Sequence, residues 1–346
     1  MTRRVLVAGH WSGGSPASST ALAALEEFGR GFLSSAVHWE VELIPFGPGS
    51  AFKEAVRGPG SSRYAPIVVP DDEHGSAWAG RKAREALESG LVPLLEGGHP
   101  HTLDCGIGFI SSLSGIEVSD SSTLEQTLPR ALSTARQILA GRDMIAAAST
   151  RRPLLGLSSV LAVDPELNAR SVQDRGLTSL LTRLLSCSEE KSLPLLDSRT
   201  QSRGSGRIPG SGAGGGVGAM VHAIGGRIID TGLFLRTLLR LDERIADADL
   251  VVVFEAKLHS PNLSDAFLDV ISSAALQHAL PVVAIGEESS LSAHERAQWG
   301  LNGQFITEGK LHLISVCKIF WRRNNSFPLK VLICSTLHKC PQLIIL

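Results

Sequence analysis

Short runs of consecutive apolar residues, separated by helical patterns, constrain the fold of this chain most strongly. Residues 250–254 read Leu-Val-Val-Val-Phe, and residues 281–286 are nearly as apolar. Helices are predicted over residues 234–245 and 266–279. Strands that are apolar on both faces belong to parallel sheets covered by helices on both sides. The strand predicted at residues 4–9 has the same character, so we expect it to join the C-terminal strands in one sheet.

The length of the chain predicts more than one domain. Its 346 residues exceed the ~250–300 at which a single hydrophobic core stops growing. We therefore predict a two-domain α/β fold, with a parallel, Rossmann-like sheet and an inserted second α/β domain. The first domain comprises residues 1–58 plus 246–308, and residues 59–245 form the inserted domain. Residues 309–346 form an atypical C-terminal tail without an acidic residue, and no function is predicted for it.

Charge and cysteine content exclude several classes of partner. A formal net charge of −1 gives no electrostatic argument for binding nucleic acid or a membrane. Five cysteines without a C-x-x-C pair argue against a disulfide framework or a zinc ribbon. No run approaches the ~18 apolar residues that span a bilayer. We therefore predict a cytoplasmic protein that acts on a small molecule, and we consider a homodimer.

The stretch from residue 209 to residue 218 contains six glycines among ten residues and precedes an apolar helical pattern. Glycine lets the backbone approach a ligand closely, and a loop that enters a helix commonly holds an anion. The alternative is a tight turn that packs the helix against a sheet. A dinucleotide fingerprint, G-x-G-x-x-G, is formally present, but a polar segment precedes it instead of a strand. The chain has no G-x-x-x-x-G-K-[ST] phosphate loop.

The glycine stretch resembles the P-G-x-G-A-A-G-G-x-G motif of bacterial glycerate kinases. Four further segments resemble motifs of that family in the same order along the chain: residues 5–15 (I-x-I-A-P-D-S-F-K-G-S), 97–108 (G-G-S-A-T-N-D-G-G-A-G, with one insertion), 149–156 (D-V-x-N-P-L-x-G) and 253–259 (T-G-E-G-x-x-D). The resemblance spans about residues 4–307. It implies a two-domain α/β enzyme that phosphorylates glycerate with ATP and Mg²⁺.

The resemblance also implies roles for individual residues. Asp104 and Glu255 would contact Mg²⁺ and the acceptor hydroxyl, and Lys257 would steer a phosphate or the substrate carboxylate. The nucleotide phosphates would be held by Gly97, Gly98, Gly210, Ser211, Gly212, Gly214, Gly215, Gly216 and Gly218. Each assignment has a structural alternative. The alternative for Asp104 is a turn cap, and the alternative for Glu255 is an ion pair with Lys257 at the sheet edge. The alternative for Lys257 is a solvated side chain without a role in binding.

Several positions depart from the family pattern. The Asp and Lys of the family's front loop are His10 and Gly13 here, and two further Asp positions are Ser149 and His259. Phosphoryl transfer needs cations and carboxylates at such positions. A catalytically impaired relative that binds a nucleotide or another ligand is therefore the competing hypothesis. A metal site formed by residues 99–105 is a further alternative, but no second ligand pair has the spacing to complete it.

Overall fold

The computed structural model describes residues 2–11, 21–35, 38–58, 60–70, 76–98, 104–118, 123–163, 175–187, 204–259, 267–306, 318–322 and 330–334. By its internal contacts the chain divides into two compact units. Unit 1 is Met1–Ala55 with Leu235–Leu346, and unit 2 is Val56–Phe234. The insertion thus begins at Val56 and ends at Phe234, whereas the sequence predicted residues 59–245.

Unit 1 contains a five-stranded parallel sheet in the order β11-β9-β7-β1-β2. The N-terminal strand lies between β2 and β7, which confirms that it joins the C-terminal strands. The strands are β1 (Arg3–His10), β2 (Trp39–Pro45), β7 (Leu250–Glu255), β9 (Val282–Gly286) and β11 (Leu301–Ile306). The chain proceeds from β1 to one edge of the sheet and later from β7 to the other edge, so the strand order reverses between β1 and β7.

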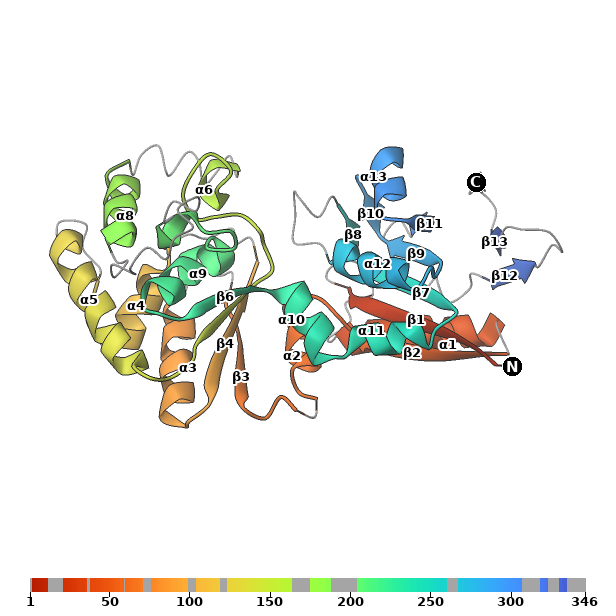
Figure 1. Ribbon diagram of the computed structural model, residues 1–346, viewed down its shortest axis with the longest axis horizontal. Helices are drawn as coiled ribbons and strands as arrows, with labels where there is room; N and C mark the ends of the chain where they lie inside the picture. The colour runs from red at the N-terminus through yellow and green to blue at the C-terminus, as the bar shows by residue number, and fades with distance from the viewer. Residues whose placement is uncertain are drawn as a thin grey trace, which may run out of the picture. The chain divides into compact units, whose positions relative to one another are not determined.

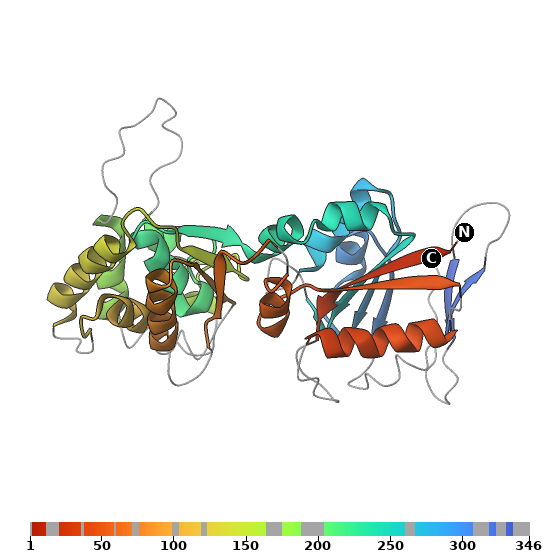
Figure 2. The same ribbon diagram turned by 90° about the horizontal axis from the view of Figure 1, so that it is seen from below.

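Helices cover both faces of this sheet (Figure 2). Because successive side chains of a strand point to opposite faces, Val5 and Val7 of β1 pack in one cluster with Phe28 of α1. Figure 2 shows α1 on one face and α11 and α12 on the other. The helices of this unit are α1 (Ala21–Ser35), α2 (Ser50–Ala55), α11 (Leu241–Ala246), α12 (Leu268–Gln277) and α13 (Ala293–Gln298).

Two short ribbons accompany the main sheet of unit 1. Strands β8 (Lys257–Leu258) and β10 (Glu288–Ser289) pair in parallel directly after β7 and β9. Strands β12 (Lys318–Arg322) and β13 (Lys330–Cys334) form an antiparallel pair near the C-terminus. The rest of the predicted atypical tail lies outside the described residues.

Unit 2 contains a four-stranded parallel sheet in the order β3-β4-β5-β6 (Figure 1). Its strands are β3 (Tyr64–Val68), β4 (Val92–Gly97), β5 (Ile145–Ala148) and β6 (Arg227–Asp230). Its helices are α3 (Ala77–Glu88), α4 (Ile107–Ser114), α5 (Leu124–Leu139), α6 (Val160–Val163), α8 (Arg175–Cys187) and α9 (Ala213–Ala223), together with the 3-10 turn η1 (Ser205–Arg207). Both sheets are parallel, so the predicted α/β class is confirmed.

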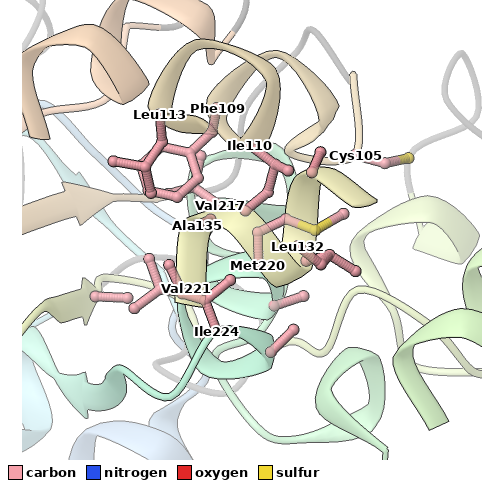
Figure 3. Close-up of a cluster of buried hydrophobic side chains, with 14 of the residues drawn as sticks. Cys105, Phe109, Ile110, Leu113, Leu132, Ala135, Val217, Met220, Val221 and Ile224 are labelled. Atoms are coloured by element: carbon pink, nitrogen blue, oxygen red, sulfur yellow. The ribbon is translucent and has the colours of Figure 1, made fainter. Parts of the chain in front are cut away.

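The core of unit 2 forms where the helix after the glycine stretch meets two other helices (Figure 3). Met220 of α9 is fully buried in the same cluster as Phe109 of α4 and Leu132 of α5. Figure 3 shows these side chains together with Val217 of α9 and Ile224, which directly follows the helix. The apolar pattern that follows the glycines is therefore a core helix, as the sequence predicted.

One predicted helix is wrong in its extent. Residues 234–245 were predicted as a single helix, but the structure has α10 (Thr231–Leu238) and α11 with a break between them. Arg240 interrupts the helix with φ of 52° and ψ of 45°, a left-handed conformation that rarely continues a right-handed helix. No helix in the described part of the chain is long and apolar enough to cross a membrane.

Candidate functional site

The carboxyl ends of β1 and β7 form the first candidate site. Ligands of open α/β sheets bind outside the carboxyl ends of the strands, at the point where the strand order reverses. In unit 1 this point lies between His10 and Glu255, which are partners in the register of β1 and β7. Sequence reasoning identified both residues separately, and the structure places them side by side on adjacent strands.

Glu255 is buried and hydrogen-bonded. Only 1% of the residue is exposed, and its Oε1 accepts a hydrogen bond of 2.8 Å from the backbone N–H of Phe267. Burial raises the pKa of the Glu255 carboxyl to about 8; the bond from Phe267 opposes this shift, and the charge of Asp269 reinforces it. Without a bound cation, the side chain at neutral pH is therefore mainly the neutral acid, which can donate a hydrogen bond.

His10 is enclosed on its Nδ1 side. Nδ1 is buried and has no hydrogen-bond partner in the described part of the chain. A Cβ at Gly47 would lie 2.3 Å from this atom, so only glycine allows the ring to lie there. The ring also packs edge-on against Phe267, with centroids 6.0 Å apart. Burial lowers the pKa of His10 to about 4, although a backbone interaction with Phe46 opposes the shift, so the imidazole is neutral at physiological pH.

Lys257 lies just beyond Glu255 on the ribbon formed by β8 and β10. Its side chain is 68% exposed, and its Nζ lies 3.5 Å from Glu288 Oε1. The predicted alternative of an ion pair between Glu255 and Lys257 is not what the structure shows, because the carboxylate near Lys257 is that of Glu288. The lysine is an exposed surface cation beside Glu288.

Asp104, in unit 2, is engaged in bonds within the protein. Its Oδ2 accepts hydrogen bonds from the N–H and the hydroxyl of Ser76, at 3.1 and 2.7 Å, and from the N–H of Gly108 at 3.1 Å. Its Oδ1 accepts a bond of 2.9 Å from the N–H of Gly106. These bonds connect the start of α3 to the start of α4, which supports the turn-capping alternative for this residue.

The glycine stretch is buried and closely packed. Every residue from Gly210 to Met220 is buried. Gly214, Gly215 and Gly216 have φ of 58°, 69° and 108°, values that glycine adopts far more readily than other residues. A Cβ at Gly216 would lie 2.6 Å from the backbone carbon of Cys105. These glycines therefore allow the loop to turn and to press against the segment that follows β4.

The backbone N–H groups of this stretch are largely used within the protein. Three of them donate to carbonyl oxygens at 3.1 to 3.2 Å: Gly210 to Arg151, Gly212 to Arg152 and Gly214 to Gly98. A Cβ at Gly97 would also lie 2.6 Å from the nitrogen of Gly214. The N–H groups of Gly210, Gly212 and Gly214 are thus engaged within the protein, which favours the packing alternative for these three residues; phosphate binding by the stretch as a whole stays a prediction. Ser211 is likewise buried, and its hydroxyl accepts a bond of 2.9 Å from the N–H of Leu154.

Sequence reasoning missed a buried polar group at the carboxyl ends of β4, β5 and β6. Glu96 is 2% exposed, and the hydroxyl of Ser149 donates to its Oε1 at 2.5 Å. The hydroxyl of Thr231 lies 3.1 Å from that of Ser149. The sequence showed that Ser149 stands where the family pattern has an Asp. It did not show that Ser149 bonds to Glu96, because Glu96 was recognised only as part of the end of a strand. A hydroxyl at this position donates to the buried carboxylate, whereas a second carboxylate would repel it.

The acids predicted for Mg²⁺ do not form a coordination set within either unit. Asp104 belongs to unit 2 and Glu255 to unit 1. Asp104 accepts hydrogen bonds on both oxygens. Within the described ranges no three His, Cys, Asp or Glu side chains are grouped as a metal would require. The metal alternative at residues 99–105 falls partly on His99 and His101, which lie outside the described residues, as does Thr102.

Taken together, the fold defines a class: two-unit α/β proteins whose parallel sheets carry buried polar side chains at their carboxyl ends. A model described as the glycerate kinase family matches residues 76–318 of this chain. That match covers more than half of the chain. The chain therefore belongs to the glycerate kinase family.

Two curated relatives and a solved structure are similar to this chain. Two uncharacterized proteins, one of Mycobacterium bovis and one of Mycobacterium tuberculosis, are each 29% identical over 219 residues, which is 62% of this chain and 51% of the relative. The chain thus spans about half the length of these relatives. A crystal structure provisionally named glycerate kinase 2 of Salmonella typhimurium LT2 is similar with a TM-score of 0.59 and 21% identity. That similarity covers 88% of this chain and 90% of the crystallised one, and it supports the fold alone.

Proposed function

We propose that this protein transfers the terminal phosphoryl group of ATP to a hydroxyl of glycerate or of a related small hydroxy acid. The observation that carries the proposal is the family match, which extends from residue 76, just before α3 in unit 2, to residue 318 at the start of β12 in unit 1. ATP as phosphoryl donor and Mg²⁺ as its counter-ion are part of the proposal on the same ground. Asp104 and Glu255 belong to different units, so neither described unit by itself holds the two acids predicted for Mg²⁺.

The described residues support distinct roles in such a reaction. Lys257 supplies an exposed positive charge beyond the carboxyl end of β7, where a substrate carboxylate or a phosphate would be attracted. Glu255 is held by the backbone of Phe267 and keeps its proton at neutral pH, so it would donate a hydrogen bond to a bound oxygen. The glycine stretch supports the strand ends through close packing rather than through open N–H groups.

A second function is favoured by specific observations. Asp104 and the N–H groups of Gly210, Gly212 and Gly214 are engaged within the protein, and His10 replaces the acid of the family's front loop. A protein built in this way would bind a nucleotide or another small ligand without turnover and would act as a binding or regulatory protein. Both proposals predict ligand binding, and they differ in whether ADP is formed.

The experiment measures ADP release in a coupled assay with ATP, Mg²⁺ and D-glycerate, together with the melting temperature with and without nucleotide. The kinase proposal expects ADP release that depends on D-glycerate and that falls at least tenfold in Lys257→Ala. The half-buried Lys53 of unit 1 gives a control, because Lys53→Ala removes the same charge from α2 and should not change the rate. Stabilisation by nucleotide without turnover would instead support the binding protein. The absence of both would reject both proposals.

The remaining expectations from the sequence also stand as proposals. A cytoplasmic location is checked by fractionation of cells that express the full chain. A homodimer is checked by light scattering of the purified protein. A single mass equal to 36.7 kDa would reject the dimer.

A further inference from the structure

The ribbon of β8 and β10 brings four polar side chains to one face. It continues the carboxyl ends of β7 and β9, and Lys257 pairs in register with Glu288. Because side chains alternate along a strand, Lys257 and His259 point to the same side of the ribbon, and so do Glu288 and Ser290. The backbone is fixed by bonds such as that from the N–H of Ser290 to the carbonyl of Leu258, at 3.1 Å.

One carboxylate oxygen lies between two nitrogen groups on this face. Glu288 Oε1 is 3.5 Å from Lys257 Nζ and 3.6 Å from His259 Nε2. The other ring nitrogen of the histidine, Nδ1, lies 2.7 Å from the hydroxyl of Ser290. When that hydroxyl donates to Nδ1, Nε2 carries a hydrogen and directs it at the carboxylate. The lysine and the histidine therefore form a two-pronged donor for an oxyanion, and the serine orients the ring.

Glu288 is held loosely in this arrangement. Both distances exceed the ~2.7–2.9 Å of a direct charge-assisted hydrogen bond. The side chains of Lys257, Glu288 and His259 are 68%, 54% and 33% exposed. Exposed ion pairs of this kind contribute little to stability. A ligand that brings its own carboxylate can therefore replace Glu288 without disturbing the fold.

We propose that Lys257, His259 and Ser290 form a subsite for the carboxylate of a small hydroxy acid, and that Glu288 occupies it until the acid displaces it. The choice of acid rests on the proposed function. A carboxylate is the expected ligand because the group already positioned between the two donors is a carboxylate. His259 stands where the family pattern has an acid, so the subsite is a property of this chain's own sequence.

The test is isothermal titration of the full chain with D-glycerate in the absence of nucleotide. Glu288→Gln removes the internal competitor and should tighten binding at least threefold, whereas Lys257→Ala should weaken it about tenfold. The neighbouring Glu287→Gln changes the net charge equally and should leave the affinity unchanged. Equal effects of Glu287→Gln and Glu288→Gln would overturn the proposal, since they would show a general field effect. Undetectable binding by both the wild type and Glu288→Gln would overturn it as well.

Two further ligands identify the group that is recognised. Glycerol has the hydroxyls of glycerate without its carboxylate, and it should not bind or compete. Inorganic phosphate should compete only weakly, and binding of phosphate tighter than that of D-glycerate would overturn the carboxylate assignment. His259→Gln, which keeps a side-chain N–H, should retain more affinity than His259→Ala, and equal affinities of these two variants would remove the histidine from the subsite.

The subsite and the kinase proposal fail in different ways. Binding of D-glycerate that responds to Glu288→Gln, without any ADP release, would keep the subsite and reject the kinase. Turnover with a KM for D-glycerate that is unchanged in Lys257→Ala and Glu288→Gln would keep the kinase and reject the subsite.

Discussion

The pH dependence of stability should reveal the proton that Glu255 holds. Its pKa is raised from 4.5 to about 8 in the folded protein, chiefly by burial. A folded pKa above the unfolded one means that the stabilisation is complete below pH 4.5 and is lost as the pH rises through 8. At about 1.4 kcal/mol per pH unit, the full effect would be about 5 kcal/mol.

His10 acts in the opposite direction over part of this range. Its pKa is lowered from 6.5 to about 4, so its contribution is present above pH 6.5 and is lost as the pH falls through 4. Between pH 4.5 and 6.5, Glu255 and His10 change the free energy of unfolding with pH in opposite directions, and the two slopes cancel. Above pH 6.5, Glu255 is the one of these two groups whose protonation still differs between the folded and unfolded states. The free energy of unfolding of unit 1 should therefore fall by about 2 kcal/mol between pH 6.5 and pH 8.

Glu255→Gln should abolish this fall. The amide oxygen still accepts the hydrogen bond from Phe267, but the side chain no longer titrates. Urea unfolding followed by fluorescence measures the effect in a Trp78→Phe background, because the other four tryptophans of the chain belong to unit 1. Glu26→Gln on the exposed face of α1 is the control and should keep the wild-type slope. A slope in Glu255→Gln equal to that of the wild type would refute the reasoning and would show that Glu255 is ionised at neutral pH.

Three further predictions concern unit 2 and are checked by urea unfolding. Gly216→Ala should lower the free energy of unfolding by more than ~3 kcal/mol, since it adds a backbone clash to a strained φ. The control is Gly141→Ala, which should cost only ~1 kcal/mol because Gly141 has a left-handed φ of 73° but lies in open space. Equal costs of the two variants would contradict the close packing at Gly216. Asp104→Ala should cost ~2–3 kcal/mol through lost bonds between α3 and α4, and an unchanged stability would argue against the capping role. Ser149→Ala should cost ~1–3 kcal/mol because buried Glu96 loses a donor, while Ser149→Thr, which keeps the hydroxyl, should cost less.

The sheet of unit 1 was predictable because its signal is local. Runs such as residues 250–254 are apolar at every position, and only a parallel sheet covered on both faces buries such a strand completely. The break at Arg240 was not predictable, because one non-glycine residue with positive φ leaves no mark in the pattern of apolar residues. The same holds for the boundaries of the insertion, which depend on contacts rather than on composition.

The candidate site was predictable in its residues and less so in their environment. Glycine composition indicated that the backbone is approached closely at residues 210–218, but it did not show which protein groups lie there, such as the backbone of Cys105 beside Gly216. Asp104 was predicted to contact a metal or a hydroxyl, or else to cap a turn, and the sequence did not show its partner Ser76, which lies 28 residues away. The bond between Glu96 and Ser149 joins residues 53 apart and has no local signature.

The contact between His10 and Gly47 couples the histories of two positions. An imidazole fits at residue 10 only while residue 47 lacks a side chain, because a methyl group there would overlap the ring. A lineage could gain histidine at residue 10 only if residue 47 was already glycine. It could not later acquire a larger residue at position 47 without losing the histidine. Among close relatives of this chain, histidine at the first position and a bulkier residue at the second should therefore not occur together.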